Sequence, residues 1–298
     1  MIYQHPLAYL VGLEGVALLR AFAGEYGRDF TAARLAEIQA LLDMAGRVGG
    51  GADIPPVTTA DGYRAWAITY DQPGNRLIEI EQPIVWQILN RLPLGTAIDA
   101  ACGTGRHAKY LVSLGHQVTG VDSSPEMLAI ARAKAPGVEF RDGDLHHLPV
   151  PDQHADLVVC ALALSHVPSL APILAEFTRV LRPGGHLVIS DTRGLFGFLG
   201  TPVVKALPAD GFGYLPHHTH LASDYLAAAL PLGLEVRRCE EPRFPDPVID
   251  PDEKPDTAVP EFYPAAHWTL QPWCPAATNA AYRDTPAVII WHFQLRGR

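Results

Sequence analysis

A glycine-rich turn between a short apolar run and a helix-compatible segment is the part of this sequence best suited to chemistry. Residues 97–108 read AIDAACGTGRHA, so the apolar run ends in the acid Asp99 and Cys-Gly-Thr-Gly follows. Glycine adopts positive φ angles and lets the backbone approach a ligand closely. Such a turn at the start of a helix predicts a seat for a nucleotide-sized molecule, although tight packing alone also uses it.

A second acid lies at the offset typical of a ribose contact. The next apolar run ends at Asp122, close to the roughly 20-residue offset at which a carboxylate on a second parallel strand accepts hydrogen bonds from ribose hydroxyls. Gly105 is followed by Arg106-His107-Ala108, which contains no third glycine. The missing glycine argues against a dinucleotide pyrophosphate, and hence against a NAD-dependent dehydrogenase, and favours a nucleoside without phosphates.

Five ordered segments resemble the motifs of the class I S-adenosylmethionine-dependent methyltransferases, in the branch that acts on small molecules. These segments are residues 99–105, 120–128, 141–149, 156–167 and 176–191. One departure is Ala101, where the family usually has glycine. The resemblance covers roughly residues 60–298 and is specific for the cofactor and the reaction, not for the acceptor.

The resemblance implies a cofactor site for S-adenosyl-L-methionine. Asp99 would lie near the methionine end, Asp122 would hold the ribose, and Asp144 with the backbone of Leu145 would face the adenine. The carbonyl of Ala161 would lie beside the methionine amino group. The complete predicted cofactor set is Tyr70, Asp99, Ala101, Gly103, Gly105, Arg106, Asp122, Ser123, Met127, Asp144, Leu145 and Ala161.

Methyl transfer needs aligned reactants, exclusion of water and, for an O–H or N–H acceptor, a base. His166 and Asp191 follow the fourth and fifth predicted strands, and His218 precedes a predicted helix, so topology places all three at the carboxyl edge of the sheet. We predict them as catalytic residues, although each could instead orient a loop or cap a helix. No metal site is predicted, because the adjacent histidines of residues 217–220 do not by themselves converge on one ion.

An aromatic cover over the cofactor is a further expectation. The family resemblance implies that an aromatic residue near the N-terminal side of the domain lies over the cofactor, and Tyr63, Trp66 and Tyr70 are the candidates. The same residues would serve equally well as ordinary core aromatics.

Composition narrows the class of partner. The chain has 298 residues, 32 acids against 23 lysines and arginines, and a formal charge of −9. This acidic balance repels phosphate backbones, so we expect a small-molecule acceptor and no nucleic acid. Four cysteines without a Cys-x-x-Cys pair suit a reducing compartment. No stretch approaches the roughly 18 apolar residues of a membrane span, so a cytoplasmic protein without membrane contact is expected.

Alternating elements predict the fold class. Strands near 96–100, 117–122, 138–141, 155–161 and 185–190 alternate with helical segments, and 234–239 and 287–295 add two more strands. This order predicts a parallel sheet with helices on both faces. The family resemblance implies an antiparallel addition, so the expected fold class is α/β with a doubly wound, mostly parallel, Rossmann-like seven-stranded sheet whose last strand is antiparallel. The Pro- and Asp-rich residues 242–286 form a long, lid-like insertion before that strand.

The N-terminal region is predicted as a separate helical extension. Residues 7–24 and 29–47 read as two amphipathic helices. The apolar face of the first is predicted to hold Leu7, Leu10, Val11, Leu18 and Leu19, and that of the second Leu35, Ile38, Leu41 and Leu42. The predicted domains are therefore residues 1–50, the helical extension, and 51–298, the methyltransferase domain. Whether the extension covers the site or builds a homodimer stays open.

The sequence thus predicts transfer of a methyl group to an O, N or C atom of a small molecule. An RNA base methyltransferase is the alternative within enzymes, and the acidic balance speaks against it. A protein that binds S-adenosylmethionine without turnover is the alternative from another class.

Overall fold

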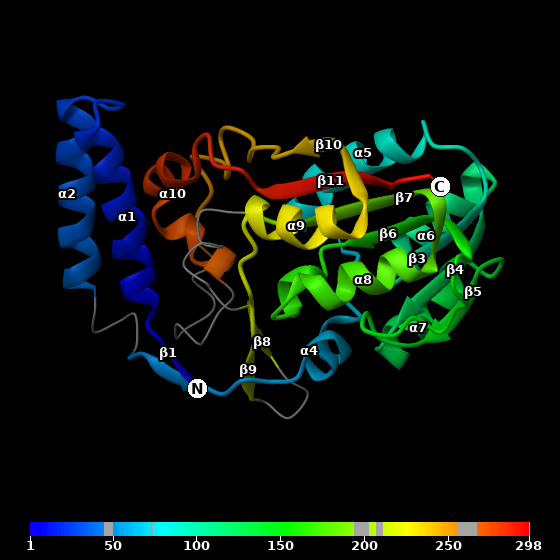
Figure 1. Cartoon of the computed structure of the whole chain (residues 1–298). Helices are drawn as coiled ribbons and strands as arrows, with labels where there is room; N and C mark the ends of the chain where they lie inside the picture. Colours follow the sequence, from blue (N-terminus) through cyan, green and yellow to red (C-terminus); the bar gives the residue numbers. More distant parts are fainter. Residues whose placement is uncertain (45–49, 73, 194–202, 207–210, 256–266, 298) are drawn as a thin grey trace. The chain divides into compact units, whose positions relative to one another are not determined.

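A computed structural model describes residues 1–44, 50–72, 74–193, 203–206, 211–255 and 267–297 (Figure 1). The chain divides into two compact units. The first comprises 1–58, 202–216 and 243–285, and the second comprises 59–201, 217–242 and 286–298. The predicted boundary at residues 50 and 51 and the lid role of 242–286 stay predictions, and residues 45–49 and 256–266 lie outside the described part. No described helix is long and apolar enough to span a membrane.

The second unit contains the seven-stranded sheet, in the order β10-β11-β7-β6-β3-β4-β5. Its elements are α4 (Thr59–Trp66), α5 (Arg76–Leu89), β3 (Thr96–Ala100), α6 (Arg106–Leu114), β4 (Gln117–Asp122), α7 (Pro125–Lys134), β5 (Glu139–Asp142), β6 (Ala155–Ala161), η1 (Leu164–His166), α8 (Leu170–Val180), β7 (Leu181–Thr192), α9 (Ala222–Ala229), η3 (Leu230–Leu232), β10 (Leu234–Glu240) and β11 (Val288–Leu295). Neighbouring strands from β7 to β5 are parallel, whereas β11 is antiparallel to both β7 and β10. The predicted α/β fold is confirmed.

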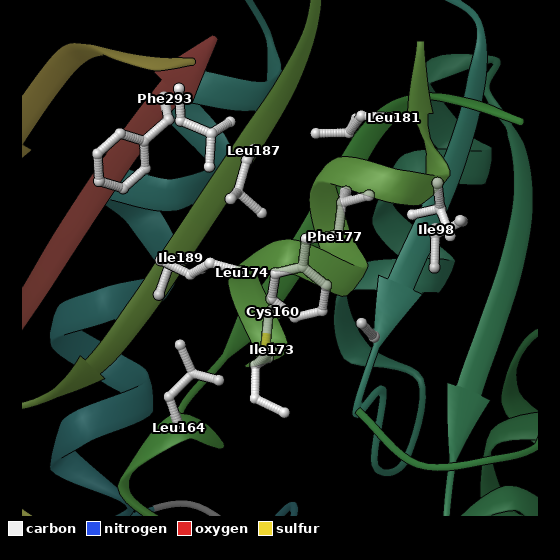
Figure 2. Packing of buried hydrophobic residues seen from close by; sticks show 14 of the residues in the cluster. Ile98, Cys160, Leu164, Ile173, Leu174, Phe177, Leu181, Leu187, Ile189 and Phe293 are labelled. Carbon is white, nitrogen blue, oxygen red and sulfur yellow. The ribbon is translucent and has the colours of Figure 1, made fainter. Parts of the chain in front are cut away.

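Helices cover both faces of this sheet. In Figure 1, α8 and α9 lie in front of the strands, and α5 and α6 lie behind them. Strand residues two apart point to the same face, so Leu187 and Ile189 of β7 both join the core under α8. Figure 2 shows Leu174 and Phe177 of α8 beside Cys160 of β6 within this core. These side chains are fully buried, which anchors the central strands whose ends carry the candidate site.

The direction of the chain through the sheet creates a switch point. From β3 the chain proceeds outward through β4 to β5, and it then returns to β6 on the other side of β3. Crossovers on opposite sides leave a crevice at the carboxyl ends of β3 and β6, which is where open α/β sheets bind ligands. Any ligand site of this unit is therefore expected at residues 101–105 and 161–166.

The first unit contains short elements from three separate parts of the chain. They are β1 (Ile2–Gln4), α1 (Pro6–Phe22), α2 (Arg28–Asp43), β2 (Ala52–Ile54), β8 (Val203–Ala206), β9 (Phe212–Leu215), η4 (His267–Thr269), η5 (Gln271–Trp273) and α10 (Pro275–Tyr282). β1 pairs with β2, and β8 pairs with β9, both antiparallel.

The two predicted N-terminal helices exist, but their predicted faces are partly wrong. Leu19, Leu35 and Leu42 are 69%, 56% and 48% exposed. On α2 the buried residues are Arg34 and Leu41. Each exposed leucine of α2 directly follows one of these, and consecutive helical residues point about 100° apart. Leu7, Leu10 and Leu41 are buried as predicted, so only part of each predicted apolar face is exposed.

Candidate active site

Two strained backbone positions flank the switch point. Ala101, directly after β3, and Leu162, directly after β6, both have φ of 55°. Left-handed backbone is costly for residues with a side chain and persists where the surrounding structure imposes it, often at functional sites. The amide of Leu162 donates to the carbonyl of Ser190 at 2.8 Å, which holds this turn against β7. Alanine at 101 therefore keeps the backbone conformation that glycine adopts freely.

The glycine turn is tied to the neighbouring strand by its backbone. Cys102 N–H donates to the carbonyl of Val121 at 3.0 Å, and Gly105 N–H donates to the carbonyl of Cys102 at 2.9 Å. Gly105 has φ of 80° and is the N-cap of α6. A Cβ built on Gly103 would meet no atom within 4 Å. The turn therefore presents an open backbone surface, as a closely approaching ligand requires.

Asp122 connects this turn to the end of β4. Its Oδ2 accepts from Gly103 N–H at 2.7 Å and its Oδ1 from Ser124 N–H at 2.9 Å. Burial raises the pKa of Asp122 above its ordinary value, although these backbone donors act to lower it. Ser124 is also the N-cap of α7, where its Oγ accepts from Met127 N–H. The carboxylate is held in one orientation and each oxygen keeps a further lone pair for a ligand.

Asp99 has a mainly structural environment. It is 1% exposed, and its Oδ2 accepts from Ala108 N–H of α6 at 2.7 Å. Burial raises the pKa of Asp99 to about 6, while His107 and the Ala108 amide act to lower it. The side chain thus stabilises the first turn of α6, which begins at the glycine turn.

Glu81 of α5 is a residue of this region that the sequence analysis missed. It is fully buried, with Oε2 accepting from Arg106 at 2.6 Å. Oε1 accepts from His107 Nε2 at 3.1 Å and from Ser190 Oγ at 2.8 Å. Burial acts to raise the pKa of Glu81, but His107 and Arg106 more than offset it, so the pKa falls to about 2. One carboxylate therefore links α5, α6 and β7 directly beneath the glycine turn.

The remaining predicted cofactor residues lie around the ends of β4 to β6. Asp144 is exposed, and its Oδ1 accepts from His146 N–H at 2.7 Å. Ser123 is exposed, Leu145 and Ala161 are half-buried, and Met127 is 1% exposed. Asp144 and Ser123 are thus available to a ligand, whereas Met127 belongs to the core that supports α7.

Three aromatic residues of α4 and the segment after it form one cluster. Trp66 and Tyr70 meet edge to face with ring centroids 4.9 Å apart, and Tyr63 contacts both. Burial raises the pKa of Tyr63 well above its ordinary value, and Tyr70, Asp122 and Asp191 add to this effect. Burial likewise raises the pKa of Tyr70 to about 12. Tyr63 therefore lies close to Asp122 at the end of β4 and to Asp191 near the end of β7. This position suits a side chain that covers the strand ends.

The predicted catalytic residues are gathered at the same edge. The Tyr63 hydroxyl lies 2.9 Å from His166 Nε2, and the backbone N–H of His218 donates to the carbonyl of Ser165 at 2.7 Å. His220 Nε2 lies 2.9 Å from the Val167 carbonyl, so its ring donates to the backbone of this loop. The histidine segment and the loop after β6 therefore hold one another in place.

Asp191 differs from the histidines in its burial. It is 2% exposed, with Oδ2 accepting from the Tyr225 hydroxyl at 3.0 Å and Oδ1 from Thr192 N–H at 2.8 Å. Burial raises the pKa of Asp191 to about 6, and the two hydrogen bonds act to lower it. This carboxyl lies beneath the site surface, where it supports Tyr225 of α9. Among the described residues, no group of three or more His, Cys, Asp or Glu side chains could hold a metal ion.

Comparison with known proteins agrees with this geometry. Residues 98–189, from β3 to β7, match a family model described as a methyltransferase domain. This span of the chain is therefore similar to a methyltransferase domain. The matched span includes the glycine turn, Asp122, Asp144 and His166.

Curated methyltransferases are similar to part of this chain. The malonyl-[acyl-carrier protein] O-methyltransferase of Yersinia pestis is 32% identical over 131 residues, covering 44% of this chain and 46% of that protein. The demethylmenaquinone methyltransferase of Chlorobaculum parvum is 44% identical over 89 residues, covering 30% of this chain and 37% of that protein. The chain thus spans less than half the length of either relative.

Solved structures share the fold of much of this chain. An S-adenosylmethionine-dependent methyltransferase from Mesorhizobium loti has a TM-score of 0.50 and 22% identity, covering 72% of this chain and 97% of that one. The complex of DhpI with SAH has a TM-score of 0.53 and 22% identity, covering 79% and 94%. At these identities the likeness concerns the fold.

Proposed function

We propose that the chain is an S-adenosylmethionine-dependent methyltransferase that transfers a methyl group to an O, N or C atom of a small molecule. The observation that carries the proposal is the Asp122 carboxylate bound to Gly103 N–H at the switch point of the sheet. This contact brings an oriented carboxylate, the open backbone of Gly103 and the N-terminus of α6 close together. This arrangement suits a nucleoside with hydroxyl and amino groups but no phosphate.

The residues around the turn fit this cofactor. Gly103 leaves open the space that a Cβ would fill, so a ligand can lie against the backbone there. Asp122 would accept from the ribose hydroxyls, and exposed Asp144 would accept from the adenine amino group. The cofactor would also be bordered by Gly105, Arg106, Ser123, Leu145, Ala101 and Ala161. Asp99 and Met127 would not touch the cofactor. They would support its site by holding α6 and α7 in place.

S-adenosylmethionine, when bound, supplies an electrophilic methyl group on a positively charged sulfur. The protein then has to orient both reactants and keep water out. Tyr63, Trp66 and Tyr70 form the aromatic cluster near Asp122 and Asp191 that would exclude water from this edge. His166 would accept the proton of an O–H or N–H acceptor, and His218 would line the same edge.

The experiment that tests the proposal is calorimetric titration of the purified protein with S-adenosylmethionine, S-adenosylhomocysteine and, separately, NAD. We expect both sulfur nucleosides to bind with dissociation constants of about 1–100 μM, in the range of ordinary substrate affinities. We expect no heat from NAD, because the turn lacks the third glycine. Binding of NAD in place of the sulfur nucleosides would contradict the proposal.

Turnover is tested with His166→Gln. The first acceptors are a demethylmenaquinol and a malonyl thioester, chosen from the names of the relatives. The rate of methyl transfer should fall about 100-fold or more for the quinol, which must lose a proton, and should stay unchanged for the malonyl carboxylate, which is already ionised. Affinity for S-adenosylhomocysteine should stay unchanged. The matched control is His154→Gln, because His154 precedes β6 at the opposite end of the same strand. An unchanged rate for the quinol in His166→Gln would remove His166 from the reaction, and no product from any acceptor would favour binding without turnover.

A further inference from the structure

A cavity of about 500 Å³ is lined by residues 70–72, 74 and 75, by Gly105, and by residues of α5, α6 and the end of α7. On α6 the lining residues include Arg106, Lys109, Tyr110 and Ser113, whose spacing marks one face of the helix. A volume of this size is within the range of small-molecule sites. On this face Arg106 borders the proposed cofactor, whereas Lys109, Tyr110 and Ser113 have no proposed role in methyl transfer.

One wall of the cavity is aromatic. The rings of Trp86 and Tyr110 stack with centroids 3.9 Å apart and planes 7° from parallel. The Tyr110 hydroxyl donates to Asn90 Oδ1 at 2.7 Å, which fixes the ring. A rigid aromatic wall favours a flat, apolar ligand surface at low entropic cost.

The cationic groups beside this wall differ in how they are paired. Arg106 is bound to Glu81, and Lys134 forms an ion pair with Asp71. Lys109, by contrast, has no ion-pair partner within the part of the chain that the structure describes. Glu79 also lines the cavity, and its Oε1 accepts from Gly74 N–H. The cavity thus combines a flat apolar wall with an ammonium group that forms no ion pair among the described residues.

We propose that this cavity binds a planar aromatic molecule that carries one acidic group. The aromatic rings of the ligand would pack against Trp86 and Tyr110, and its carboxylate, sulfonate or phosphate would pair with Lys109. The site borders Gly105 and Arg106 of the cofactor turn but does not depend on methyl transfer. It is therefore a second ligand site beside the proposed cofactor site.

Fluorescence titration with two matched probes tests this site. 1-Anilinonaphthalene-8-sulfonate carries an acidic group, and N-phenyl-1-naphthylamine has the same ring system without it. We expect saturable one-to-one binding of the sulfonate, about fivefold tighter than that of the neutral probe, which corresponds to a single exposed ion pair. Lys109→Gln should remove this difference, whereas Lys254→Gln, at an exposed lysine of the other unit, should preserve it.

Further variants distinguish the contribution of the aromatic wall to probe binding from that of the Lys109 charge, and both from cofactor binding. Tyr110→Leu should weaken both probes equally, because it removes half of the aromatic wall. Lys109→Gln should leave the affinity for S-adenosylhomocysteine unchanged, so failure of the cofactor proposal would be seen separately. The inference is overturned if Lys109→Gln binds the sulfonate as tightly as the wild type, or if the wild type shows no saturable binding.

Discussion

Replacing Asp122 with alanine will weaken the binding of S-adenosylhomocysteine by about 1–3 kcal/mol, or about 5- to 150-fold. The side chain is the proposed acceptor for the ribose hydroxyls, which would be left without a partner. It also orients the glycine turn through Gly103 N–H and the start of α7 through Ser124 N–H. Calorimetric titration of the variant and the wild type measures the difference.

The neighbouring strand offers a matched control for this variant. Asp142 ends β5 and lies directly opposite Asp122 in the parallel register. Asp142→Ala removes an acid at the same edge of the sheet and should leave the affinity within about twofold of the wild type, as is usual for exposed positions. Asp122→Asn, which keeps one acceptor oxygen, should lie between the wild type and the alanine variant. An unchanged affinity in Asp122→Ala would remove the ribose assignment.

Replacing Glu81 with glutamine will destabilise the protein by about 3 kcal/mol at pH 7. Removing one partner of a buried ion pair leaves the other charge uncompensated, which typically costs 3–5 kcal/mol. Here the Glu81 carboxylate forms hydrogen bonds with Arg106, His107 and Ser190. Urea unfolding gives the difference in the free energy of unfolding. Glu79→Gln, at an exposed position of the same helix, is the control and should stay within about 0.5 kcal/mol.

The loss in Glu81→Gln will depend on pH in a defined direction. The pKa of Glu81 falls from the ordinary 4.5 to about 2 in the folded chain. A lowered pKa contributes stability that is fully present above pH 4.5 and is lost as the pH falls toward 2. The difference between the wild type and Glu81→Gln should therefore be constant above about pH 5 and shrink in acid. A difference that grows in acid would contradict this assignment.

Most strands and helices were predicted from local patterns of residue types. The turn around Gly103 and Gly105, the acids ending two strands, and the alternation of apolar runs with helical segments all act over a few residues. They therefore predicted the ends of β3, β4 and β6 correctly. The antiparallel β11 was expected from the family resemblance. The faces of α1 and α2 were predicted less well, because periodicity shows that a helix has an apolar side but not which neighbour covers it.

Contacts between distant residues were beyond the reach of these patterns. Glu81 looked like an ordinary helix residue, and its role follows from Ser190, 109 positions later. Tyr63 and His166 meet although 103 positions separate them. Asp191 was expected just after a strand but lies inside β7, and its burial against Tyr225 is visible only in the folded chain.

The sequence by itself determined the strands along the chain and the glycine turn with Asp122, because backbone conformation follows from local residue types and their spacing. Only the tertiary structure decided which side chains surround that turn: Glu81 beneath it, the Tyr63 cluster beside it, and the aromatic wall of Trp86 and Tyr110 on the far side of α6. The physical reason is that packing and desolvation act between residues that are neighbours in space and not along the chain.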